Sequence, residues 1–226
     1  MTWLRRFRPR GHPSAILLVV QLLCVVLYPF IEDTDYGRTA LNAVGVFVLV
    51  LTIRTVEKTP GPTWISVALA IPVIGLLGMQ SLGHMEALLP WSAGLEAIFY
   101  FYAAISLIAY MMHDDQVTAD ELFAAAATFT LLIWAFTHLY VMIQALQPTA
   151  YSEIGTLRSW SDLNHLSFAL LTGTGMGNVV AVSKHARSVA SIEMMTGLMY
   201  LATVVTRLIG FTMHPSRRKP PSHTED

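Results

Sequence analysis

Apolar runs long enough to cross a lipid bilayer are the feature that most constrains this chain. A helix needs about 20 apolar residues to cross the hydrocarbon core, and the sequence carries several such runs between short polar segments. Hydrophobic residues make up 54% of the chain and charged residues only 13%, about half the charged share of soluble domains. We therefore expect an all-α integral membrane protein, with little chain left for a soluble catalytic domain.

Six transmembrane helices are expected, with a shorter apolar segment between the fifth and the sixth. The spans are predicted at 14–30, 39–56, 63–79, 86–112, 119–146 and 186–212. The segment 161–171 is too short to span, which favours a re-entrant helix. The first span has the basic start and apolar core of a signal peptide, but no small-residue cleavage site follows it, so we expect it to remain as an anchor.

Basic residues gather on one side of the predicted membrane. Four arginines precede the first span, Arg54 and Lys58 follow the second, and three basic residues follow the sixth. With six spans these nine residues share one side, and the opposite side carries only four. The positive-inside rule then places both termini in the cytoplasm of a multi-pass protein of the cell inner (plasma) membrane.

Several classes of function are excluded by what the sequence lacks. The net charge of −1 argues against nucleic acid as a partner. Cys24 is the single cysteine, so the chain cannot form an intrachain disulfide or a cysteine metal cluster. The sequence contains neither a G-x-S-x-G nor an H-E-x-x-H motif, and the spans hold no carboxylates paired at helical spacing. We therefore do not expect an enzyme.

The stretch from Thr172 to Asn178, T-G-T-G-M-G-N, is the segment most suggestive of chemistry. Glycine permits positive φ, so alternating glycines can aim successive carbonyls the same way. Rings of such carbonyls replace the hydration shell of a cation in channel filters. The preceding short helix, capped by Ser159 or Ser161, would also point its partly negative end at a cation. On the residues alone, a glycine-rich turn between two helices explains the stretch equally well.

From about residue 117 to residue 210 the chain resembles bacterial six-helix ion channels with a potassium-channel pore. Ser167 and Phe168 match the pore helix of that family, and Thr172, Gly175 and Gly177 match its filter. The helix that follows matches without a gap at Ser183, Ala186, Arg187, Ser188, Glu193, Gly197, Tyr200, Leu201, Ala202, Arg207, Leu208, Ile209 and Gly210. The residues from 117 to 120 also look like the start of the family's fifth helix.

The resemblance implies a homotetramer in the lipid bilayer. Four copies of a selectivity filter would bind monovalent cations, and permeant K⁺ or Na⁺ is expected there with no other cofactor. The chain would then divide into a basic N-terminus (1–13), a four-helix transmembrane domain (14–112), a pore domain (117–212) and a cytoplasmic tail (213–226). The implied filter residues are Thr172, Gly173, Thr174, Gly175, Met176 and Gly177.

The departures from the family lie in the filter itself. Gly173 replaces a threonine whose hydroxyl supplies ion ligands, and Thr174 replaces a valine. Met176 replaces a tyrosine that braces the filter, and methionine is flexible. Asn178, at the mouth, replaces an aspartate. We therefore expect a cation channel with weak potassium selectivity. The alternative is a non-conducting protein that keeps the pore fold as a structural or regulatory scaffold.

Two residues of the last span are candidates for supporting and opening the pore. Ionisable groups inside a membrane are costly and often functional, so Glu193 either supports the filter or makes a polar contact with the fifth or pore helix. Gly197 lies where the resembled family bends to open. It is equally well explained by close packing between helices.

The remaining polar residues of the spans carry weaker signals. Glu96 has no obvious partner in the sequence, and Arg207 is expected to snorkel towards the headgroups. His138 and His165 are expected to be packed polar residues rather than ligands or pH sensors. The fourth span contains no Lys or Arg, so it offers no voltage sensor and we expect little dependence of gating on voltage.

Overall fold

The structure is a computed structural model that describes residues 13–32, 37–57, 62–83, 86–112, 119–152 and 156–212. The described residues form α-helices and one short 3₁₀ helix without any strand, which confirms the all-α class. Their bounds are α1 (Pro13–Glu32), α2 (Gly37–Val56), α3 (Thr63–Gly83), η2 (Glu86–Leu88), α4 (Leu89–Met111), α5 (Ala119–Leu146), α6 (Trp160–Leu171) and α7 (Lys184–Thr212).

Three of these helices are long and apolar enough to cross a membrane. They contain the segments Ser14–Ile31, Leu89–Met111 and Asp120–Leu146. Helices α2 and α3 contribute shorter apolar stretches, Ala43–Val56 and Trp64–Gln80. The structure therefore supports membrane character, whereas the count of six spans stays a prediction. All the lysines and arginines of the predicted terminal segments 1–13 and 213–226 lie outside the described residues.

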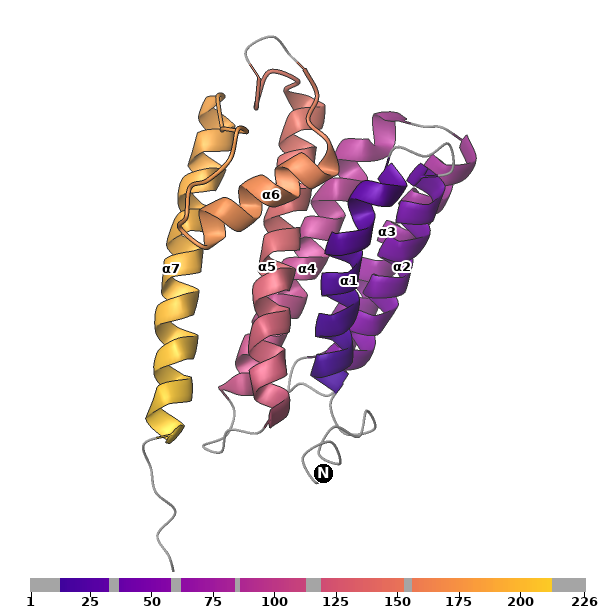
Figure 1. The fold of residues 1–226 in the computed structure, drawn as a ribbon. Coiled ribbons are helices and arrows are strands. Elements are labelled where there is room, and N and C mark those ends of the chain that lie inside the picture. The colour runs from indigo at the N-terminus through magenta and orange to yellow at the C-terminus, as the bar shows by residue number, and fades with distance from the viewer. Residues whose placement is uncertain are drawn as a thin grey trace, which may run out of the picture.

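The long helices run alternately in opposite directions, so that α1 begins and α7 ends at the same end of the molecule (Figure 1). At that end the Ser14 hydroxyl donates to the Asp120 carboxylate over 3.0 Å, which joins the start of α1 to the start of α5. Arg207 of α7 lies 3.8 Å from the Glu121 carboxylate and 3.5 Å from the Met112 sulfur. These contacts place both ends of the described chain on one side.

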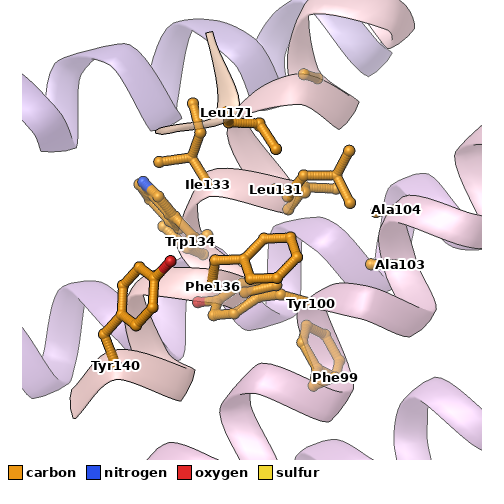
Figure 2. Close-up of a cluster of buried hydrophobic side chains, with 14 of the residues drawn as sticks. Phe99, Tyr100, Ala103, Ala104, Leu131, Ile133, Trp134, Phe136, Tyr140 and Leu171 are labelled. Atoms are coloured by element: carbon orange, nitrogen blue, oxygen red, sulfur yellow. The ribbon is translucent and has the colours of Figure 1, made fainter. Parts of the chain in front are cut away.

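The core lies between α4 and α5 (Figure 2). Aromatic rings of the two helices interlock there, with Phe101 edge-on to Phe136 at 4.9 Å between ring centroids and Tyr100 edge-on to Trp134 at 5.8 Å. Small buried residues on α4, such as Ala103, allow the helices to approach closely. Every residue from 130 to 137 is buried. Helix α5 is therefore the central helix, and it contacts α1, α4, α6 and α7.

Candidate functional site

The short helix α6 begins where the sequence predicts, within one residue. The Ser159 hydroxyl accepts a hydrogen bond from the Asp162 backbone N–H at 3.1 Å, and the Asp162 carboxylate accepts one from the Ser159 N–H at 3.3 Å. This capping box satisfies two backbone donors that the first turn would otherwise leave unpaired. Of the two predicted caps, Ser159 is confirmed.

Helix α6 lies between α5 and α7 and crosses them obliquely (Figure 1). Two buried side chains fasten it to α5. Asn164 donates from Nδ2 to the Thr137 hydroxyl at 3.1 Å, and the Ser167 hydroxyl is 2.9 Å from the Ile133 carbonyl. Because both contacts are shielded from water, they fix the position of α6 along α5 and the rotation of α6 about its own axis.

Glu193 joins all three helices of this region. Its carboxylate is fully buried and accepts hydrogen bonds from the Tyr140 hydroxyl of α5 and the Ser167 hydroxyl of α6. We call Tyr140, Ser167 and Glu193 the Glu193 cluster. The geometry matches the predicted alternative of a polar contact with a neighbouring helix, because Glu193 contacts both α5 and α6. A role in supporting the filter stays a prediction.

Tyr151, in the segment after α5, packs beside the cluster. Its ring packs edge-on against Tyr140 at 5.6 Å. Burial, reinforced by the nearby Glu193 carboxylate, raises the pKa of Tyr151 above its ordinary value. The Tyr151 phenol therefore stays neutral beside the cluster.

The residues from Thr172 to Gly177, which we call the glycine loop, end α6 and turn the chain back towards α7. The φ angles of Gly173 and Gly175 are +71° and +63°, and that of Gly177 is +156°. The positive φ expected at the glycines is thus present. Gly173 donates to the Leu170 carbonyl at 3.1 Å and Gly175 to the Ala169 carbonyl at 3.1 Å. Gly173 is the left-handed residue that terminates α6.

The glycine loop has little cover from its own chain. All residues from 172 to 178 are exposed, and the Met176 side chain is 71% exposed. The Thr172 hydroxyl donates back to the Phe168 carbonyl at 2.6 Å and lies 3.1 Å from the Thr174 hydroxyl. The two threonine hydroxyls thus lie next to each other at the carboxyl end of α6, while the residues of the loop remain exposed.

Gly197 lies directly against the end of α6. A Cβ atom built on this glycine would lie 2.0 Å from the Leu171 carbonyl oxygen, far inside van der Waals contact. The backbone of α7 therefore touches the last turn of α6 at this position. This favours the close-packing explanation for Gly197, and the gating hinge stays a prediction.

The segment after the glycine loop is anchored to the segment after α5. The Val182 N–H donates to the Ala150 carbonyl at 2.8 Å, and the Arg187 Nε donates to the Ala181 carbonyl at 3.1 Å. The Ser183 hydroxyl then caps α7 by accepting from the Ala186 N–H at 3.2 Å. The loop is thus held at both ends while its middle stays exposed.

One expectation about the polar residues is corrected, because His165 is exposed rather than packed. Arg207 lies 3.8 Å from the Glu121 carboxylate, so its guanidinium has a partner within the chain, and its extension towards headgroups stays a prediction. Glu96, for which the sequence shows no partner, pairs with His138 at 3.2 Å.

Sequence reasoning missed three side chains that hold α6 in place. Thr137, Tyr140 and Asn164 are buried and hydrogen-bonded across helices. Thr137 and Tyr140 are three residues apart and hence on one face of α5, so polar residues at helical spacing inside an apolar run were an available signal.

Comparison of the chain with protein-family models, with curated proteins and with solved structures found no match.

Proposed function

We propose that four copies of this chain form a cation channel whose pore is lined by the glycine loop and whose selectivity for potassium over sodium is weak. The observation that carries the proposal is the exposed glycine loop at the carboxyl end of a short capped helix, with left-handed φ at Gly173 and Gly175. Successive carbonyls of such a loop can face one axis, and the helix end favours a cation there.

The proposed topology has six spans, with α6 entering the membrane and returning. Helix α6 has 12 residues and is about 18 Å long, too short for a hydrocarbon core of about 30 Å. The alternating helix directions and the shared end of α1 and α7 support an even number of crossings. The basic residues then place that end in the cytoplasm.

Four copies are proposed because one chain leaves the glycine loop unprotected. Irregular backbone at membrane depth is tolerated only where protein buries it or water lines it, and an unpaired polar group in lipid costs several kcal/mol. Helix α7 also turns large apolar side chains outward beside the loop, including Ile192, Met195 and Leu198 at 60–70% exposure. Packing of neighbouring copies would cover these side chains and close a ring of loops around water and ions.

The first prediction concerns assembly. The purified chain in detergent or nanodiscs is expected to have the mass of a tetramer, and limited chemical cross-linking should give a ladder that ends at four. Cross-links placed at Met195→Cys in a Cys24→Ser background should join different copies. A control at Ile71→Cys, exposed on α3, should join few. A stable monomer or dimer that conducts no ions would contradict the assembly.

The second prediction concerns selectivity. In liposomes under opposing sodium and potassium gradients, the reversal potential is expected near zero, since Met176 and Asn178 lack the brace and the charge of the resembled filter. The variant Thr174→Val, Met176→Tyr, Asn178→Asp should shift it towards the potassium equilibrium value. Adding Gly173→Thr should help less than the resemblance implies, because threonine in the left-handed region costs about 1–2 kcal/mol.

The outcomes of that measurement are distinct. A wild-type reversal potential already at the potassium value would contradict weak selectivity. Complete absence of flux from correctly assembled tetramers, in both the wild type and the triple variant, would favour the non-conducting scaffold.

A further inference from the structure

A cavity of about 390 Å³ lies among the first five helices, away from the glycine loop. Helices α1 to α5, the residues just before α6 and the first residue of α6 line it. Its size falls within the range of about 300–1,000 Å³ typical of small-molecule sites. The cavity is therefore large enough for a ligand and separate from the proposed pore.

One wall of the cavity is a continuous series of aromatic rings. Tyr28 of α1 stacks on Trp160 at 4.2 Å between centroids, Trp160 meets Trp134 edge-on at 6.2 Å, and Trp134 meets Tyr100 at 5.8 Å. All four residues line the cavity. Such a wall suits an aliphatic or aromatic body, because the rings offer large rigid apolar area.

Arg158 brings a positive charge to this apolar space. Gln144 holds its backbone on both sides, accepting from the Arg158 N–H at 2.8 Å and donating to the Arg158 carbonyl at 2.9 Å. Its half-buried side chain forms no hydrogen bond or ion pair with any residue that the structure describes, and its Nε is buried without an acceptor. A guanidinium held in this way can bind a carboxylate or phosphate through two parallel hydrogen bonds.

The other polar side chains of the cavity are largely matched among themselves. Glu96 pairs with His138 at 3.2 Å, and Gln80 donates to the Ser92 hydroxyl at 2.8 Å. A second donor is left over, since the Trp134 indole N–H is also buried without an acceptor in the described part of the chain. The cavity groups without a partner among the described residues, Arg158 Nε and the Trp134 indole N–H, are thus both hydrogen-bond donors. A ligand that satisfies them must supply an acceptor, preferably an anion.

We propose that this cavity binds an amphipathic anion, with its carboxylate or phosphate on Arg158 and its apolar body against the aromatic wall. The ligand is either an anionic lipid of the surrounding bilayer or a soluble amphipathic anion, and the binding chemistry is the same. The site does not depend on whether the chain conducts ions.

Cys24 provides a direct probe, because it lines the cavity and is the only cysteine of the chain. We would measure its reaction with negatively charged sulfonatoethyl and positively charged trimethylammonioethyl methanethiosulfonate, following the mass of the intact protein in detergent. The ratio of the anionic to the cationic rate reports the potential inside the cavity. Arg158→Gln should lower this ratio about tenfold, as the loss of one unit charge nearby predicts.

Two further variants separate a change in charge or volume from a change in folding. Lys184→Gln removes one exposed positive charge from α7, outside the cavity, and should leave the ratio unchanged. Gly45→Phe fills the cavity from α2, where a Cβ meets no atom within 4 Å. It should slow both reagents alike. An unchanged ratio in Arg158→Gln, or an equal fall in Lys184→Gln, would overturn the assignment.

Binding itself is tested by protection of Cys24. Octanoate should slow its modification by a neutral methanethiosulfonate at concentrations where octanol does not, and about tenfold more octanoate should be needed in Arg158→Gln. In nanodiscs, protection by phosphatidylglycerol but not by phosphatidylcholine would identify the membrane as the source. Protection by octanoate alone would identify a soluble anion. If neither anion protects Cys24, the proposed site is wrong.

Discussion

Replacing Gly197 with alanine is expected to destabilise the protein by more than about 3 kcal/mol, towards the upper end of the effects of single substitutions. The new Cβ would lie 2.0 Å from the Leu171 carbonyl oxygen and under 3.0 Å from the Leu171 carbonyl carbon and Cα. These atoms belong to the last turn of α6, so no flexible side chain can move aside. Either α7 moves outward or the end of α6 unwinds, and both displace the glycine loop.

The measurement is thermal or denaturant unfolding in detergent, together with the fraction of tetramer by size exclusion. Gly75→Ala is the matched control, because Gly75 also lies inside a helix and a Cβ there meets no atom within 4 Å. That substitution should be neutral or stabilise by about 0.5–1 kcal/mol. A Gly197→Ala protein that unfolds and assembles like the wild type but opens poorly would refute the packing argument and favour the hinge.

Replacing Glu193 with alanine is the second large effect, expected at about 3–4 kcal/mol with cation flux falling to the level of empty liposomes. The substitution leaves the Tyr140 hydroxyl without its acceptor and opens a cavity between α5, α6 and α7. The Ser167 hydroxyl keeps the Ile133 carbonyl at 2.9 Å as an alternative acceptor. Helix α6 therefore loses its hydrogen bond to α7 but keeps its hydrogen bonds to α5. The glycine loop at the end of α6 is then no longer held in one position relative to α7.

Glu193→Gln separates hydrogen bonding from charge at the same position. The amide oxygen can accept from Tyr140, and the amide N–H₂ can donate to the Ser167 hydroxyl while that hydroxyl turns to Ile133. We expect this variant to keep most of its stability and flux. Tyr140→Phe, which removes one donor, should cost about 1–2 kcal/mol. If glutamine is as damaging as alanine, the negative charge of Glu193 itself is what the proposed pore requires.

Much of the local structure follows from residue patterns. The capping residue Ser159, the start of α6, the positive φ of the glycines and the long apolar helices are each determined within a few neighbouring residues. Backbone geometry and hydrogen bonding act over that range, so these features were predictable. The predicted assembly and ion pathway depend on other copies of the chain, and they stay predictions for that reason.

Composition and residue spacing are enough to predict an all-helical chain, apolar helices of spanning length, and a glycine loop that follows a short helix. Which polar groups meet depends instead on how the helices pack against one another. Glu96 lies 42 residues before His138, and Glu193 lies 53 residues after Tyr140, so no local pattern can pair them. Helix packing also leaves no room for a side chain at Gly197 and leaves a cavity beside Arg158. Both features depend on how whole helices fit together.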